Sequence, residues 1–239
     1  MKKLFIIAIA SFITSNAMAL EFEPQEGFTN MVFLGMNATN VRNSDFDGKI
    51  GGVMGFRTDY ILPKAHGTYI TLGIDWTMKG GKASRTEIDP LDGVTEQKAT
   101  AKTNLHYIEV PFRVGFRYNF NKHIGVYGEV GPYFAIGVGG KHKYEVDADG
   151  AQWGDVEDAN TWKAFKKSTV NANFQRWDTG LGFRVGTEYN QHYNLMLGCD
   201  WGFTDMWRDS YRDAMWSAGT PILGKAKNFN FTLAFGFRF

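Results

Sequence analysis

The sequence lacks two features that are common in exported proteins, a set of disulfide bonds and a long apolar helix that anchors the chain in a membrane. It has a single cysteine, Cys199, so no disulfide can form within the chain. Beyond the N-terminus it has no apolar run near the roughly 20 residues that a spanning helix needs. Proline is scarce, with six residues, whereas glycine (28) and aromatic residues (15%) are abundant. This composition favours many strands joined by tight turns.

The N-terminus has the pattern of a secretory signal peptide. Lys2 and Lys3 precede the apolar run LFIIAIASFI, and the small-residue triplet Ala17-Met18-Ala19 follows. Cleavage of residues 1–19 leaves residues 20–239 as one exported domain. Without the two lysines, 24 basic residues stand against 25 acidic ones, a formal charge of −1. This balance predicts no general attraction to nucleic acid or to anionic lipid.

Apolar residues recur at every second position in much of the chain. The pattern is most regular in the last twelve residues, NFNFTLAFGFRF, and it predicts strands. The expected strands cover residues 28–38, 48–62, 68–80, 105–120, 124–139, 176–189, 193–203 and 228–239. The period of two places Cys199 on the apolar face, as a small apolar side chain.

The connections between these strands alternate in length. Short connections cover 63–67, 119–123 and 190–192, and long ones lie near 39–47, 81–103, 140–174 and 204–227. This alternation is typical of a closed, antiparallel, all-β transmembrane barrel with short periplasmic turns and long extracellular loops. Eight is an even number of strands, so both termini would lie in the periplasm. Ten strands, with a further hairpin inside 140–174, are the alternative.

The polar face of the strands decides which way the apolar face points. A soluble barrel or sandwich would show the same period with its apolar face inward. Here the polar face carries mainly Arg and acids among glycines, which suits enclosed, bidentate ion pairs. We therefore expect a lumen filled by an ion-pair network and a poor ion conductor. Its predicted members are Arg57, Asp59, Asp75, Glu109, Arg113, Arg117, Glu129, Arg176, Asp178, Arg184, Glu188, Asp200 and Arg238.

The apolar face also has features of an outer-membrane protein. Aromatic residues near strand ends, among them Tyr60, Trp76 and Trp177, are expected in girdles at the lipid interfaces. The terminal strand, with Phe235, Phe237 and Phe239, resembles the signal that delivers bacterial barrels to the outer-membrane assembly machinery. We expect outer-membrane lipid and that machinery as partners, in a Gram-negative bacterium.

Two motifs resemble those of the PorT-like outer-membrane β-barrel family of Bacteroidota. Tyr107 to Pro111 reads YIEVP, and Gly128 to Tyr133 reads GEVGPY, a looser version of the second motif. The resemblance implies a small barrel of the OmpA/OmpX type and transfers no activity. Because proline lacks the N–H of the strand ladder, Pro111 and Pro132 predict a bulge or kink nearby.

Little in the sequence points to catalysis. A lipid-modifying enzyme would need a set such as His106 with Ser84, Asp75 or Glu87, and nothing marks that set out. The Asp- and Gly-rich segments read as turns, so we expect no metal or cofactor. Aromatic residues of the long loops form a candidate binding surface for an unknown ligand or protein, namely Trp153, Trp162, Trp207, Tyr211 and Trp216. A structural or binding role is expected, with a narrow channel or the enzyme as alternatives.

Overall fold

A computed structural model of the chain describes residues 26–42, 47–88, 96–148, 161–165, 174–217 and 224–239. The predicted signal peptide lies outside these residues. The elements are β1 (Gly27–Arg42), β2 (Lys49–Ile61), β3 (Thr68–Ile88), β4 (Glu96–Asn119), β5 (Ile124–Ala148), β6 (Thr161–Lys163), β7 (Trp177–Tyr189), β8 (Tyr193–Gly202), α2 (Asp209–Ser217) and β9 (Lys227–Arg238). No helix among the described residues has the length and hydropathy needed to cross a membrane.

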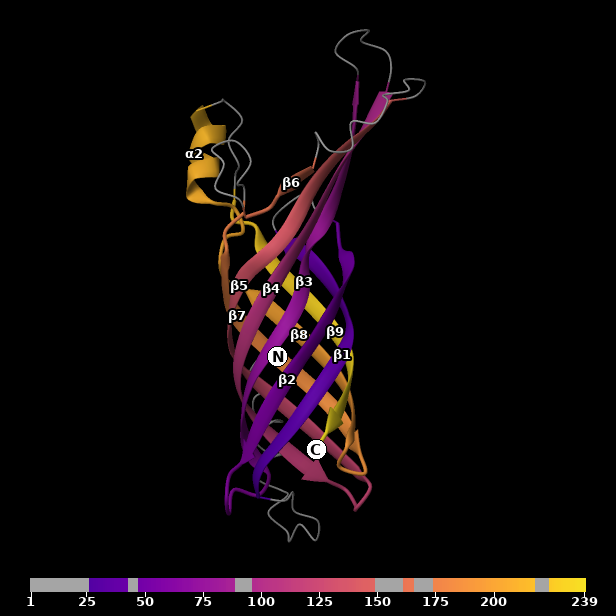
Figure 1. The fold of residues 1–239 in the computed structure, drawn as a ribbon, viewed down its shortest axis with the longest axis vertical. Coiled ribbons are helices and arrows are strands. Elements are labelled where there is room, and N and C mark those ends of the chain that lie inside the picture. Colours follow the sequence, from indigo (N-terminus) through magenta and orange to yellow (C-terminus); the bar gives the residue numbers. More distant parts are fainter. Residues whose placement is uncertain (1–25, 43–46, 89–95, 149–160, 166–173, 218–223) are drawn as a thin grey trace, which may run out of the picture.

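Eight of the strands close into an antiparallel barrel (Figure 1). Each pairs with its neighbours along the chain, β5 pairs with β7, and β1 pairs with β9 to close the wall. At this seam Asn30 and Phe239 exchange two backbone hydrogen bonds of 3.0 and 2.8 Å. The three-residue β6 pairs with the extracellular part of β5 and adds nothing to the wall. The barrel is therefore eight-stranded, and the ten-stranded alternative is wrong.

Three strands continue well past the predicted boundaries. β3 runs to Ile88, β4 begins at Glu96 and β5 runs to Ala148, so much of 81–103 and 140–148 is strand rather than the expected loop. Figure 1 shows these strands rising together above the barrel mouth. The prediction failed because these segments carry few large apolar side chains, so the alternation that marks the membrane part is absent. Segments such as EQKATAKTN contain no large apolar residue and carry no period-two signal.

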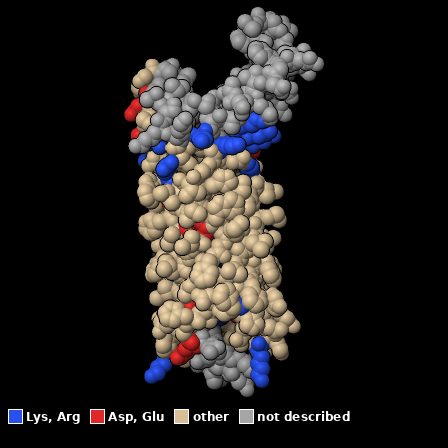
Figure 2. All heavy atoms as spheres, viewed as in Figure 1, with Lys and Arg blue, Asp and Glu red and all other residues tan. Residues whose placement is uncertain are grey.

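The two faces of the wall are inverted relative to a soluble protein. Large apolar side chains point outward, as at Phe28 (74% exposed) and Leu34 (69%), whereas charged side chains such as Arg57 (1%) are buried inside. Figure 2 shows that the surface of the barrel wall is almost entirely uncharged on the face in view. Trp177 is exposed at the extracellular end of β7, and Trp76 stacks on His106 with ring centroids 5.5 Å apart. Cys199 lies on the same outward face, half-buried.

The irregularity in the ladder is displaced from the prolines. The register of β4 on β5 shifts between His106 and Tyr107, which pair with Gly139 and Gly137 and leave Val138 as the extra residue. Across Pro111 the register is the same on both sides. No register shift therefore marks Pro111 and Pro132, although the β4–β5 ladder has no pair at Phe112 or Arg113, and the predicted kink there stays a prediction. Proline removes a donor from the ladder without inserting a residue, and only an inserted residue shifts the register.

Candidate functional site: a charged lumen beneath an apolar plug

The lumen of the barrel holds charged side chains from every strand of the wall except β1. Among the described residues, six cations and seven acids point inward and are nearly inaccessible. Strand alternation places them, since polar residues at every second position meet inside a closed wall. The residues are Arg57, Lys79, Arg113, Arg117, Arg184, Arg238, Asp59, Asp75, Glu109, Glu129, Asp178, Glu188 and Asp200.

At the periplasmic end two arginines share two acids. Asp59 accepts hydrogen bonds from Arg117 and Arg238, and the Nε atoms of the same arginines lie 3.6 and 3.3 Å from Glu188 Oε2. This group borders a pocket of about 120 Å³ that is also lined by His192 and Phe239. The quartet is balanced in charge and ties together strands that are distant in sequence.

The middle of the lumen holds three arginines. Arg184 binds Asp200 through two parallel hydrogen bonds of 2.7 Å. Arg57 and Arg113 both donate to Glu129 Oε1, at 2.9 and 3.4 Å, and Arg57 Nη2 also lies 3.7 Å from Asp75. Such forked pairs are the strongest kind of side-chain hydrogen bond, and they fit the planar guanidinium.

Lys79 is the centre of the extracellular third of the lumen. Its ammonium donates to Glu109 at 3.1 Å and to Asp178 at 2.9 Å, and lies 4.5 Å from the centroid of the Tyr133 ring. Asn228 also donates to Asp178, at 2.9 Å. The predicted network omitted Lys79, although its spacing from Asp75 in β3 places it on the same face.

Arg176 is a correction to the predicted network. Its side chain is exposed, and it lies one residue before β7 begins at Trp177. Alternation applies only within a strand, so the position of Arg176 two residues before Asp178 does not turn it inward. Lys79 takes its place in the count, and the lumen keeps six cations.

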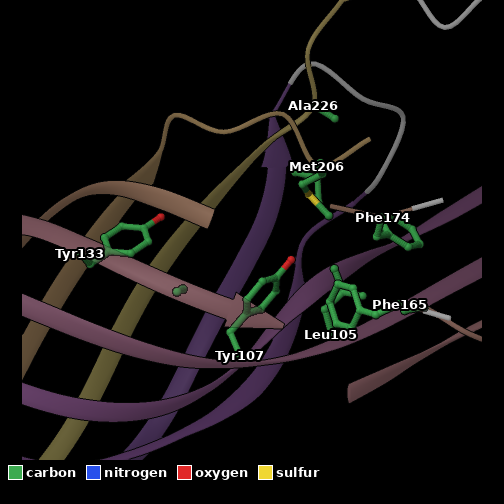
Figure 3. Packing of buried hydrophobic residues seen from close by; sticks show 10 residues of the cluster. Leu105, Tyr107, Tyr133, Phe165, Phe174, Met206 and Ala226 are labelled. Atoms are coloured by element: carbon green, nitrogen blue, oxygen red, sulfur yellow. The ribbon is translucent and has the colours of Figure 1, made fainter. Parts of the chain in front are cut away.

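An apolar plug covers the lumen at the extracellular mouth (Figure 3). Tyr107 and Tyr133 point up from the wall, and Phe165, Phe174 and Met206 meet them from the extracellular segments. All of these side chains are at most 5% exposed. The plug, defined here as this cluster, comprises Val41, Leu105, Tyr107, Tyr133, Ala135, Ala164, Phe165, Phe174, Met206 and Ala226.

Phe165 is seated against the wall by a glycine. A Cβ at Gly137 would lie 2.3 Å from the Phe165 ring, so only glycine admits the ring at this place. On its other side Phe165 meets Tyr107 edge to face, with centroids 5.7 Å apart. Backbone hydrogen bonds hold the segments that carry the plug, as from Ala164 N to Gly140 O at 3.1 Å. The plug is therefore fastened to the strands and not merely laid over them.

The five aromatic residues of the predicted binding surface do not lie in one environment. Trp207 stacks between Phe174 and Tyr211, at 5.2 and 5.5 Å, so it supports the plug, and burial raises the pKa of Tyr211. Trp216 in α2 is 71% exposed. Trp153 and the side chain of Trp162 lie outside the described residues. Packing thus explains two of the five aromatics, and Trp216 remains available for contact.

The candidate catalytic residues do not come together. His106 lies on the outward face against Trp76, whereas Asp75 lies in the lumen, so the wall of the barrel separates them. The Ser84 hydroxyl is 3.2 Å from that of Thr100. The side chain of Glu87 lies outside the described residues. Within the described part of the chain, no group of three or more His, Cys, Asp or Glu has a metal-binding arrangement.

Comparison with protein-family models matches residues 16–208 to the outer membrane protein beta-barrel domain family. The chain belongs to this family. It is an integral protein of the outer membrane of a Gram-negative bacterium, in agreement with the inverted faces of the wall. Among curated proteins no match was found.

Several solved outer-membrane proteins are similar to this member of the family. The attachment invasion locus protein Ail of Yersinia pestis is 13% identical, with 90% of this chain and 100% of that one covered and a TM-score of 0.38. OprG from Pseudomonas aeruginosa is 11% identical, with coverage of 92% and 99% and a TM-score of 0.40. Neisserial surface protein A is 10% identical, with coverage of 90% and 98% and a TM-score of 0.40. These values transfer no role to this chain.

Proposed function

We propose that this protein is a sealed outer-membrane barrel with a structural or binding role at the cell surface, rather than a transport channel. One observation carries the proposal: buried ion pairs occupy the lumen at three successive levels. Ion pairs run from Arg238 at the periplasmic end to Lys79, and the Tyr133 ring that covers Lys79 already belongs to the apolar plug. Eight-stranded barrels are just wide enough for side chains to fill, and conduction needs an open aqueous path.

The extracellular elements supply the surface for a binding role. β3, β4 and β5 project beyond the mouth on one side, and α2 lies at the other side of the mouth in this view (Figure 1). Trp216 is exposed on α2, and large exposed aromatics on projecting elements favour contact with a partner. The partner proposed here is a surface ligand or protein reached from outside the cell.

The PorT-like assignment is kept as part of this proposal. Glu109 of the YIEVP motif binds Lys79, and Glu129 of the GEVGPY motif binds Arg57 and Arg113. The acidic residue in each of these two segments therefore forms ion pairs inside the lumen. The pairing of Glu109 supports the assignment through the YIEVP motif alone, and it gives no activity.

Ion efflux from liposomes tests the seal. Folded protein is reconstituted at several protein-to-lipid ratios, with a general porin as the conducting reference. The proposal predicts efflux at the level of protein-free liposomes, because no continuous aqueous path crosses the barrel. Rapid efflux that increases with the amount of protein would contradict the proposal and favour the narrow channel.

A further inference from the structure

The outer face of α2 presents a tryptophan that no described residue covers. Trp216 is 71% exposed, although α2 lies beyond the barrel mouth and its surroundings are aqueous (Figure 1). Comparably exposed side chains such as Phe28 belong to the barrel wall, where lipid covers them. An indole ring in water contributes nothing to the packing of the chain that carries it, so Trp216 marks a surface for contact.

α2 is held firmly by its inner face. Arg212 donates hydrogen bonds to Asp205 at 2.6 Å and to the Gly224 carbonyl at 2.7 Å. The Tyr211 ring stacks on Trp207, which in turn stacks on the plug. Because these contacts fix the helix on the mouth, its outer face is presented in one orientation. A partner therefore binds without paying to order this surface.

Two aspartates share the outer face with Trp216. Asp209, Asp213 and Trp216 are separated by four and three residues, a spacing that aligns them in one stripe along the helix. All three side chains are exposed, and neither carboxylate has a hydrogen bond or an ion pair with another described residue. Figure 2 shows acidic side chains at the outer edge of the region where α2 lies. The stripe combines negative charge with an aromatic ring.

The stability of the helix accounts for only one of the two aspartates. Asp209 lies in the first turn, where a carboxylate interacts favourably with the helix dipole. Asp213 lies four residues further on, where it repels Asp209 and gains nothing from the dipole. The last turn has no basic residue to compensate for it. A cation supplied by a partner would satisfy both carboxylates.

We propose that this face of α2 binds an extended, cationic segment of a partner protein, with basic side chains on the two aspartates and over the Trp216 ring. The inference rests on the binding role proposed above and specifies the chemistry of the partner. Among aromatic rings, indole attracts a cation most strongly. An apolar partner would leave the two carboxylates unpaired.

The spacing of the stripe fits an extended segment. Four helical residues at about 1.5 Å each place Asp209 and Asp213 roughly 6 Å apart along the axis. In an extended chain, side chains on one face lie about 6.7 Å apart. Basic residues at every second position of the partner therefore match the two aspartates.

Titration of the folded protein in a non-ionic detergent with a peptide of alternating lysine and serine tests this proposal. Chemical shifts of the α2 amides report binding. Asp213→Asn and Trp216→Leu should each weaken binding about threefold, because exposed ion pairs and cation–π contacts are individually modest, and together about tenfold. Asp47→Asn, at an exposed aspartate outside α2, is the matched control and should bind as the wild type does. Hydrogen exchange of residues 209–217 verifies that α2 is formed in each variant.

Further variants and probes separate the kinds of contact. Trp216→Phe should retain part of the affinity that Trp216→Leu loses, because only an aromatic face attracts a cation. A peptide with glutamate in place of lysine should not bind. Equal binding of the two peptides, wild-type affinity of Trp216→Leu, or an equal loss in Asp47→Asn would each overturn the proposal. Liposome efflux tests the sealed barrel separately, so a leaking barrel that still binds the lysine peptide contradicts only the proposed seal.

Discussion

The interior of the barrel has two regions that are stabilised differently, the charged lumen and the apolar plug. Where the wall faces lipid, the lumen holds thirteen charged side chains in ion pairs. At the mouth, where water surrounds the strands, the interior is the apolar plug. In water, burial of apolar surface drives the extracellular segments onto the mouth. In the lumen, polar side chains from all strands pack together instead. Each buried charge there is stable only while it is paired with an opposite charge from another strand.

Removal of Lys79 should break the charged region most severely. Lys79→Ala leaves Glu109 and Asp178 without their cation, and the expected loss of unfolding free energy is about 3–5 kcal/mol. Urea unfolding in lipid vesicles, followed by gel mobility, measures this loss. Lys64→Ala in a periplasmic turn is the control and should change little. A Lys79→Ala barrel as stable as the control would show that the pairs contribute little.

Removal of Phe165 should disturb the plug and spare the wall. Phe165→Ala empties the space against Gly137 and Tyr107, at a cost of about 3 kcal/mol to the packing of the plug. Faster hydrogen exchange is expected in residues 161–165 and 224–226, with an unchanged midpoint for unfolding of the barrel. If the midpoint falls as far as in Lys79→Ala, the two regions are one cooperative unit.

Alanine substitutions at two glycines, Gly198 and Gly139, test how tightly the charged region is packed. A Cβ at Gly198 would lie 2.3 Å from Arg184 Cδ, so Gly198→Ala should displace the arginine from Asp200 and cost about 1–3 kcal/mol. A Cβ at Gly139 meets nothing within 4 Å, which makes Gly139→Ala the matched control. Equal unfolding midpoints for the two variants would contradict tight packing around Arg184.

Phe239 closes the seam and is also the proposed delivery signal, and variants can separate the two. Deletion of Phe239 removes the two seam hydrogen bonds with Asn30, at about 1 kcal/mol each, together with the aromatic side chain. Phe239→Ala keeps the backbone and removes the proposed delivery signal. We expect both variants to assemble poorly in cells, and only the deletion to be less stable after refolding. Normal assembly of Phe239→Ala would argue against a signal at this position.

The sequence predicted the membrane part of the fold closely and the extracellular part poorly. Lipid on one side and packed charges on the other impose the period of two on β7 and β9, which were found within one residue of their bounds. The extensions of β3, β4 and β5 carry few large apolar residues, so no such period marks them. The plug was missed because its members come from separate segments, and no local pattern brings Phe165 to Gly137.

The positions of the charged residues were also predicted only in part. Arg176 was misplaced because alternation was extended past the start of a strand, and Lys79 was omitted although it shares a face with Asp75. The formal charge of −1 predicted no attraction to anionic lipid. The structure separates the charges, with six cations and seven acids inside the lumen, and a net sum averages over that separation.

Single-channel recording in planar bilayers tests the sealed lumen most directly. The wild type, Phe165→Ala, Arg57→Ala/Glu129→Ala and the combination of these three substitutions are compared under the same salt conditions. The two single-region variants each leave the other filling in place, so they and the wild type should give no stepwise conductance, whereas the combination should conduct. Steady conductance steps from the wild-type protein would contradict the central claim.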